Sequence, residues 1–330
     1  MERQGRDKAG RTGRRWCAVL LAVAVACLSS CTPQSRTLRV GTNDFAGYEL
    51  LYLARDMGFY GKARIELLEF PSTTEVLRAY RNGAIDVAAV TADEALLASD
   101  DEEAHAILVL DTSAGADAIY ARPEFDSMRS LRGHRIGVET GALGALVLSR
   151  ALQLNGMLPE EVQVVPLTLD AHESGYMDGA VDAVVTFDPI CERLEAAGAV
   201  RVFDSQRMPN EIIDLLIASA GTVRGRHDDL ASLVKGWLRA REHLQAHRAD
   251  ALQRLAGRVR NRTADSMGRA LDRLEIPDRS KLLQWLGKGP DSLDLPLKNL
   301  LDLMMRENLL PRSATPSLVL DDRFVREAGQ

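Results

Sequence analysis

The sequence has few of the features that indicate a catalyst, a metal protein or a disulfide-stabilised domain. Its 330 residues include only four cysteines and six histidines, and aromatic residues make up 5% of the chain. Neither a Gly-x-Ser-x-Gly nucleophile motif nor a Gly-Lys-Ser/Thr phosphate loop occurs. His243 and His247 have helical spacing, but the arginines around them indicate a solvated face rather than a metal site. We therefore expect no catalysis, no metal and no cofactor.

The N-terminal segment is first basic and then apolar. Six Lys or Arg residues precede Trp16, and an uninterrupted apolar run of 13 residues continues to Leu28. As a helix this run spans about 20 Å, less than the roughly 30 Å of a bilayer core, so it predicts a signal segment rather than a permanent span. Adjacent arginines, Arg14 and Arg15, leave general and twin-arginine export both open.

The apolar run ends at Leu-Ser-Ser-Cys, residues 28–31, which resembles a bacterial lipoprotein cleavage box. We expect residues 1–30 to be a signal peptide, Cys31 to be lipidated, and 31–36 to be a linker. The protein is then periplasmic or extracytoplasmic and anchored to a membrane through lipid, and either membrane of the envelope remains possible. Only Cys191 stays free, so no intramolecular disulfide is possible.

Charge excludes a further class of partner. Residues 1–30 carry six basic and two acidic residues, so the rest of the chain has a formal net charge of −10, against −6 for the whole. An acidic chain of this kind is no candidate for binding nucleic acid or anionic lipid surfaces.

The remaining 300 or so residues read as two strand-loop-helix series followed by helices. This alternation predicts parallel sheets flanked by helices, with the polar loops at the carboxyl ends of the strands facing a crevice. Asn43, Thr73 and Thr91 should share one rim of it. The expected strands are 37–41, 65–70, 86–90, 106–110 and 118–121, then 135–138, 162–166, 183–186, 200–203 and 212–218. From Asp228 onward the pattern is helical.

Two kinds of feature in the loops could contact a ligand. The loop 140–144 precedes a helix, so its backbone N–H groups could hold an anionic or carbonyl group, or could only cap the helix. Phe45, Tyr48 and Phe187 lie in or beside loops, where an aromatic ring could cover a ligand or pack in the core.

Several short segments in order resemble the nitrate/sulfonate/taurine and thiamine-pyrimidine group of ABC-transporter substrate-binding proteins. They are Val-Gly-Thr-Asn at 40–43, Gly-Tyr at 47–48, Leu-Tyr-Leu-Ala-Arg-Asp at 51–56, Gly-Phe-Tyr at 58–60, Gly-Ala-Ile-Asp-Val at 83–87, 111–119, 131–138, 179–185 and Asp-Pro at 188–189. The resemblance covers about residues 37–220.

This resemblance implies an α/β, two-lobed periplasmic-binding-protein type II fold with a ligand cleft and a helical C-terminal region. The first lobe would comprise 37–113 and 216–330, the latter as its return and the C-terminal helices, and the second lobe 114–215. Carried over to this sequence, the ligand-binding residues are Asn43, Asp44, Phe45, Tyr48, Thr73, Thr91, Ser113, Thr140, Gly141, Ala142, Phe187, Asp188 and Asp214.

Two departures from the family pattern bear on the ligand. Phe187 stands where relatives often have Trp, and no arginine occupies the matched loops, although a buried anion needs a cation or many donors. Carboxylates are common there instead: Asp44, Asp93, Asp117, Glu139, Asp188 and Asp214. If several face the ligand, an amine or pyrimidine is favoured over a sulfonate. If they cap helices, the ligand class stays open.

Three functions are compatible with this reading. The first is a monomeric solute-binding lipoprotein that delivers a small molecule, of the amine, pyrimidine or sulfonate class, to the permease subunits of an ABC importer by cleft closure. The second is a lipoprotein that signals ligand occupancy to a membrane receptor. The third is an enzyme resembling a thiamine-pyrimidine synthase, which the scarcity of cysteine disfavours.

Overall fold

Two β-sheets organise the chain from Leu38 onward. The computed structural model describes residues 36–329, except 101, 142, 260–261 and 312. Cys31 and Ala142, two of the residues singled out from the sequence, lie outside the described residues. No helix in the described part of the chain is both long and apolar enough to cross a membrane.

The first sheet is mixed. Its strands are β1 (Leu38–Thr42), β2 (Ile65–Glu69), β3 (Val87–Thr91), β4 (Ala104–Ser113), β10 (Ile213–Ser219), β11 (Leu274–Glu275) and β12 (Leu318–Leu320). Their order is β11-β4-β10-β3-β1-β2, with β12 also paired to β4. The pairs β1–β2 and β1–β3 are parallel, whereas β10 lies antiparallel between β3 and β4. All five residues of β3 (Val-Ala-Ala-Val-Thr) are buried, which requires cover on both faces.

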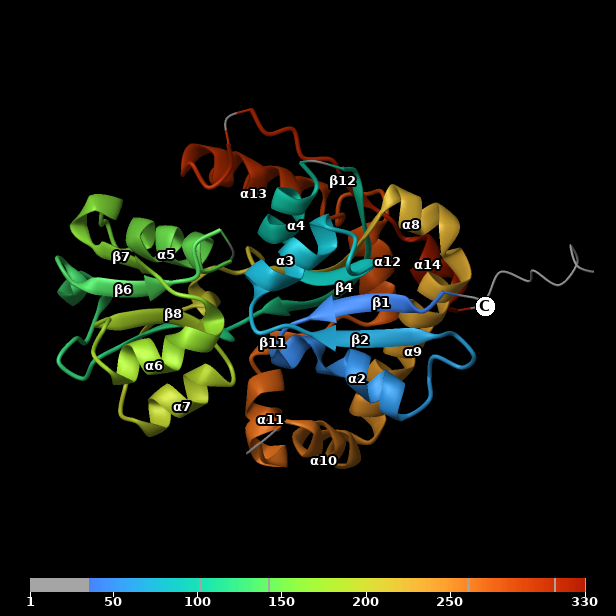
Figure 1. The fold of residues 1–330 in the computed structure, drawn as a ribbon, viewed down its shortest axis with the longest axis horizontal. Helices are drawn as coiled ribbons and strands as arrows, with labels where there is room; N and C mark the ends of the chain where they lie inside the picture. The colour runs from blue at the N-terminus through green and yellow to red at the C-terminus, as the bar shows by residue number, and fades with distance from the viewer. Residues whose placement is uncertain (1–35, 101, 142, 260–261, 312, 330) are drawn as a thin grey trace, which may run out of the picture. The chain divides into compact units, whose positions relative to one another are not determined.

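Helices supply that cover (Figure 1). They are α2 (Glu49–Asp56), α3 (Thr73–Arg81), α4 (Ala92–Ala98), α8 (Ala220–Gly225), α9 (His227–Ala246), α10 (Arg248–Arg258), α11 (Ala264–Leu271), α12 (Arg279–Leu286), α13 (Asp294–Arg306) and α14 (Arg323–Glu327). In Figure 1, α3 and α4 lie above the sheet and α2 lies below it. The long helix α9 packs on α2, and α13 packs on α4, so C-terminal helices add a second layer. We call this sheet with its helices lobe 1.

The second sheet is smaller and has helices on both faces. Its strands are β5 (Asp117–Ala121), β6 (Arg135–Val138), β7 (Gln163–Pro166), β8 (Ala183–Phe187) and β9 (Val200–Asp204), in the order β7-β6-β8-β5-β9. Figure 1 shows α5 (Leu143–Leu154) above it, and α6 (His172–Met177) with α7 (Ile190–Ala196) below. We call this sheet with its helices lobe 2.

Two short crossings join the lobes. One runs from Ser113, the end of β4, to Asp117, the start of β5, and the other runs from β9 to β10. Hydrogen bonds tie the crossings together: the hydroxyls of Ser113 and Ser205 are 2.7 Å apart, and the Gly115 amide donates to Ser205 Oγ at 2.7 Å. Gly115 has φ of 115°, a backbone conformation that glycine adopts without strain. The crossings therefore form one small hydrogen-bonded unit between the sheets.

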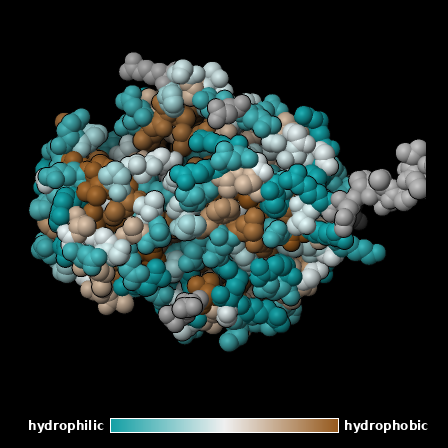
Figure 2. Space-filling view, in the orientation of Figure 1, coloured by the Kyte–Doolittle hydropathy of each residue, from teal (hydrophilic) through white to brown (hydrophobic). Residues whose placement is uncertain are grey.

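The surface fits an acidic protein in water. Figure 2 shows hydrophilic residues over most of the face seen in Figure 1, with hydrophobic residues in smaller patches between them. Large apolar side chains that are well exposed in the described part of the chain include Leu158 and Leu295, both at 64%.

The α/β organisation expected from the sequence, with two sheets covered by helices, is observed, but two details differ. The region from Asp228 onward, read as helical throughout, also supplies β11 and β12, which are too short to produce an alternating pattern. The sequence reading also missed α6, a six-residue helix with Gly175 inside it. The lobe boundaries proposed from the resemblance remain predictions.

Candidate ligand-binding site

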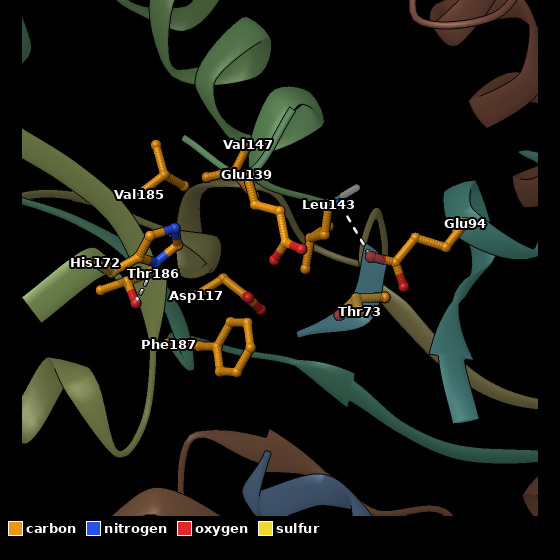
Figure 3. A pocket seen from close by; sticks show the side chains of 11 residues that line it. Thr73, Glu94, Asp117, Glu139, Leu143, Val147, His172, Val185, Thr186 and Phe187 are labelled. Carbon is orange, nitrogen blue, oxygen red and sulfur yellow. Dashed lines mark hydrogen bonds between the residues drawn. The ribbon is translucent and has the colours of Figure 1, made fainter. Parts of the chain in front are cut away.

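Two small cavities lie where the carboxyl end of the first sheet meets lobe 2, and each has a volume of about 20 Å³. They share lining residues from both lobes: Thr73 and Glu94 from lobe 1, and Asp117, Leu143 and Phe187 from lobe 2. Figure 3 shows the first cavity, with the carboxylates of Glu94, Asp117 and Glu139 around it. A space of this size holds about one water-sized group.

Loops after β1, β2 and β3 supply the polar rim on lobe 1. Asn43 follows β1, Thr73 opens α3, and Thr91 ends β3, so the order of the parallel strands puts all three at one edge. Asn43 Nδ2 donates to Thr73 Oγ1 at 2.7 Å. Asn43 Oδ1 is buried and accepts no hydrogen bond from any described residue. The rim therefore retains one free acceptor at the second cavity.

Three aromatic rings form a wall of the second cavity. Phe45 packs edge-to-face on Tyr48 and on Phe187, with ring centroids 5.2 and 5.3 Å apart. Tyr48 donates its hydroxyl proton to Asp214 Oδ1 at 2.7 Å. Burial raises the pKa of Tyr48 well above its usual value, so this hydroxyl remains a donor.

Asp214 and Asp111 form a buried acidic pair behind that wall. They are directly opposite each other on β10 and β4, which brings their side chains together on one face. Burial, and then the charge of Asp111, raise the pKa of Asp214 well above its usual value. Burial, and then the charge of Asp117, raise the pKa of Asp111. The pair therefore retains a proton at neutral pH, as two close carboxyls do when no cation is present.

Asp117 brings a further carboxylate from lobe 2. It begins β5 at the first crossing, is 3% exposed, and lines both cavities. Its Oδ2 has no hydrogen-bond partner in the described ranges, and neither has Asp214 Oδ2. Burial raises the pKa of Asp117 to about 7, opposed by a hydrogen bond from Ser113. Asp117 Oδ2 is therefore a buried acceptor without a protein donor, whereas Asp214 shares the proton of its pair with Asp111.

Glu94 links the two lobes through its carboxylate. Thr91 N donates to Glu94 Oε2 at 2.9 Å, within the first turn of α4. Leu143 N, at the first turn of α5 in lobe 2, donates to Glu94 Oε1 at 3.1 Å, as drawn in Figure 3. The amino end of α5 is an anion-binding position because its N–H groups and helix dipole point outward. The protein's own carboxylate occupies that position.

Two other groups complete the lobe 2 wall. Glu139 Oε1 accepts from the backbone N of Thr74 at 3.1 Å and from its hydroxyl at 2.6 Å, a second direct link between lobes. His172 Nδ1 lies 3.1 Å from Thr186 Oγ1. Burial lowers the pKa of His172 to about 4, so the ring is neutral at physiological pH.

The structure separates the predicted ligand residues into those at the cavities and those elsewhere. Lining residues are Asn43, Phe45, Tyr48, Thr73, Thr91, Phe187 and Asp214. Asp44 lines a larger outer groove of about 390 Å³, and Ser113 lies in the crossing. Thr140 and Gly141 are exposed and line neither cavity. Asp188 lies 3.3 Å from Arg273, in an ion pair between lobes.

Some of the carboxylates weighed as ligands do cap helices. Asp93 accepts the Thr91 hydroxyl at 2.6 Å and lines neither cavity. Glu94 and His172 were not singled out from the sequence, whereas Leu143 belongs to the loop 140–144, whose backbone N–H groups were considered as donors to an anionic group. Glu94 could have been, since it stands three residues after Thr91 at the start of a helix, the spacing of a capping box. Its second bond, to Leu143, has no sequence signal.

Comparison with known proteins places the chain in a family. The sequence model of the NMT1-like family matches residues 32–259, more than half of the chain. The chain belongs to the NMT1-like family. This confirms the resemblance inferred from the short motifs.

Relatives of this NMT1-like protein include sulfonate-binding proteins. A putative aliphatic sulfonates-binding protein of Escherichia coli K12 is 24% identical over 159 residues, which are 43% of this chain and 46% of that protein. The chain thus matches about half the length of this curated relative. The crystal structure of the alkanesulfonate-binding protein SsuA from Xanthomonas axonopodis pv. citri, bound to MOPS, has a TM-score of 0.73 at 18% identity, covering 86% of this chain and 97% of that one.

The same fold also occurs in an enzyme. The desulfurization enzyme DSZB has a TM-score of 0.66 at 17% identity, covering 88% of this NMT1-like chain and 98% of the enzyme. At these identities the structural likeness establishes the fold and leaves the activity to the site itself.

Proposed function

We propose that this NMT1-like protein is the solute-binding component of an ABC importer. In this proposal the chain is exported, anchored to a membrane through Cys31, and binds a small molecule between its lobes for delivery to permease subunits. The observation that carries the proposal is the pair of small cavities, lined from both lobes and next to two short crossings. The names of its relatives, which include binding proteins for sulfonates, support the same role.

Cleft closure would work through the direct contacts between lobes. The bonds from Leu143 N to Glu94 and from Thr74 to Glu139 hold the lobes together without a ligand. Since each cavity is about 20 Å³, a larger solute has to enter when the lobes are further apart. A solute that contacts both lobes then favours the closed form in proportion to its extra binding there.

We propose binding rather than catalysis because Cys191, the free thiol in the described part of the chain, is unsuited to be a nucleophile. Cys191 is completely buried on α7 in lobe 2, and its Sγ lies 3.9 Å from the Ala116 carbonyl. Burial raises the pKa of its thiol well above the usual value, which suppresses the reactive thiolate.

Solute binding can be tested by thermal-shift screening with amines, pyrimidines and sulfonates, followed by calorimetry. A ligand at a hundred times its Kd stabilises the protein by about 2.7 kcal/mol. Tyr48→Ala removes part of the aromatic wall and a bond to Asp214, so we expect at least about tenfold weaker binding. Leu158→Ala, at an exposed position in lobe 2, is the control. A screen in which no small molecule of any class raises the melting temperature contradicts the proposal.

The anchor is tested separately. Mass spectrometry of the protein purified from membranes should find acyl chains on an N-terminal Cys31, and Cys31→Ser should move the protein to the soluble fraction. Unmodified Cys31 in a chain that keeps residues 1–30 contradicts the anchor and leaves solute binding intact.

A further inference from the structure

We propose that the solute is a small organic cation with N–H donors, an ammonium or amidinium group on a flat or apolar body, held between Asp117 and Asp214. This inference rests on the proposed function and names the chemical class of its ligand. Four observations, each from different residues, carry it.

The first observation is a pair of unused acceptors. Asp117 is 3% exposed and Asp214 is 1% exposed, yet Oδ2 of each has no hydrogen-bond donor among the described residues. Asp117 comes from lobe 2 and Asp214 from lobe 1, and both line the second cavity. Buried polar atoms in folded proteins are almost always paired, so Asp117 Oδ2 indicates a missing donor, and Asp214 has no donor on this side beyond Tyr48 and the proton that it shares with Asp111. A ligand with at least two N–H groups supplies it.

The second observation is the absence of a positive side chain. No Lys or Arg is among the described residues that line either cavity. The arginines near this part of the cleft are engaged elsewhere: Arg258 with Glu49 and Glu69, and Arg273 with Asp188 and Glu195. Arg262 lines neither cavity; its charge acts on Asp44 and Asp188, and its buried guanidinium nitrogens have no hydrogen-bond partner among the described residues.

An oxyanion in this place would therefore meet only repulsion. The acidic groups around it are Glu94, Asp117, Glu139 and Asp214, with Asp93 and Asp111 buried behind them. The one basic group that lines a cavity, His172, is neutral. A desolvated anion requires a cation or several donors. No described Lys or Arg lines the cavities, and Asn43, Tyr48 and Thr91 already donate to Thr73, Asp214 and Asp93. A cation is attracted by those carboxylates that are ionised.

The third observation concerns the position where an anion would otherwise bind. The amino end of α5 already receives Glu94, whose Oε1 accepts from Leu143 N at 3.1 Å. A sulfonate or carboxylate would have to displace that carboxylate and leave it unpaired in a buried place. The intramolecular bond thus removes the anion-binding position of lobe 2.

The fourth observation is the aromatic wall. Phe45, Tyr48 and Phe187 pack edge-to-face, and all three line the second cavity beside Asp214. Aromatic faces attract cations and cover flat or apolar groups. The wall therefore suits the body of the solute while the carboxylates hold its charged end. The cavities fit one N–H-bearing group each, so the rest of the solute needs the lobes further apart than they are here.

The experiment compares probes of matched shape and different charge. Benzylamine, benzamidine, benzyl alcohol and benzenesulfonate form one set, and butylamine, putrescine, butanol and butanesulfonate form another. Each is tested by thermal shift at pH 8 on the purified protein, and the best binder is measured by calorimetry. We expect an amine or amidine to bind, with the matched alcohol and sulfonate at least tenfold weaker.

Two variants then test the assigned residues. Asp117→Asn and Asp214→Asn should each weaken cation binding at least tenfold, while Glu160→Gln, an exposed carboxylate on lobe 2, should leave it unchanged. Because removing an unpaired buried charge does not harm the fold, both Asn variants should melt no lower than the wild type without ligand. This combination of weaker binding and retained stability separates a ligand contact from a structural role.

Two outcomes overturn the inference. If the sulfonates bind and the amines do not, or if both Asn variants bind the cation as tightly as the wild type, the ligand class is wrong, while the solute-binding function stands. If neither charge class binds in any set, both the inference and the proposed function are contradicted.

Discussion

Two of the places where the lobes meet differ in whether their carboxylates have partners. The first is formed by Asp188 and α7 of lobe 2 with α11 and Arg273 of lobe 1, and we call it the α7–α11 contact. Its acidic side chains from lobe 2 all have partners: Glu192 pairs with Ser266 and Arg269, and Asp188 and Glu195 pair with Arg273. At the cavities, Asp117 and Asp214 have oxygens without a donor from any described residue. Paired acids hold the lobes together, whereas the unpaired buried acids keep acceptor oxygens that no described side chain uses.

The pH dependence of stability gives the largest expected effect, and it comes from the unpaired acids. Burial raises the pKa of Asp117 to about 7, so the folded state binds this proton more tightly than the unfolded state. The ligand-free protein should therefore lose stability as pH rises from about 4 to about 7, by roughly 2–4 kcal/mol from this residue. Asp111 and Asp214, with raised pKa values, add to the loss in the same direction.

Urea denaturation at pH 5, 6.5 and 8 measures this effect. Asp117→Asn should flatten the profile over that range, since Asn cannot titrate. Asp93 and Asp188, whose charges also raise the pKa of Asp117, remain in the variant. They account for the pH dependence of stability that the variant keeps. If the free energy of unfolding of the wild type stays level or rises between pH 5 and 8, the cavity acids are not destabilising when ionised. They then do not differ from the paired acids of the α7–α11 contact.

Breaking the paired contact should also lower stability, by a somewhat smaller amount. Arg273→Ala leaves Asp188 buried at 4% exposure without its cation, so we expect a loss of about 1–2 kcal/mol at pH 7. Arg248→Ala is the matched control, because its pair with Asp272 is largely exposed and should contribute about 0.5 kcal/mol or less. Equal losses in the two variants, measured by urea denaturation, would mean that the Arg273 contact is an ordinary surface pair.

The smallest effect is expected at Arg269, which is 61% exposed in its pair with Glu192. Arg269→Ala should change stability by about 0.5 kcal/mol or less, because solvent screens an exposed pair. Its ligand affinity should change by about twofold or less, since the pair only biases closure. Calorimetry against the best binder of the wild type checks this. A tenfold change would make the α7–α11 contact as important for binding as the cavity acids.

Sequence patterns predicted the architecture well because each lobe repeats a local unit. The loop after Val40-Gly41-Thr42 and the turn before Thr73 place polar side chains at strand ends, and parallel pairing then gathers them at one edge. Asn43, Thr73 and Thr91 could therefore be placed together from spacing alone. The strands β11 and β12 could not, because two or three residues carry no periodic signal.

The sequence alone could not predict the role of each carboxylate. Asp93 and Glu94 are neighbours on α4, yet Asp93 is satisfied by Thr91 while Glu94 spans to Leu143 in the other lobe. Asp188 follows Phe187 directly in the sequence, and it pairs with Arg273, 85 positions later. Whether such a side chain caps, pairs or stays free depends on partners distant in the chain.

The sequence by itself determined the two α/β lobes, their polar strand ends and the acidic character of the protein, because hydrophobic periodicity and turn residues act over a few positions. Only the tertiary structure decided which acids are neutralised and which face an enclosed space. That decision follows from burial and from contacts between lobes, where a difference of a few ångströms separates an ion pair from an unpaired charge.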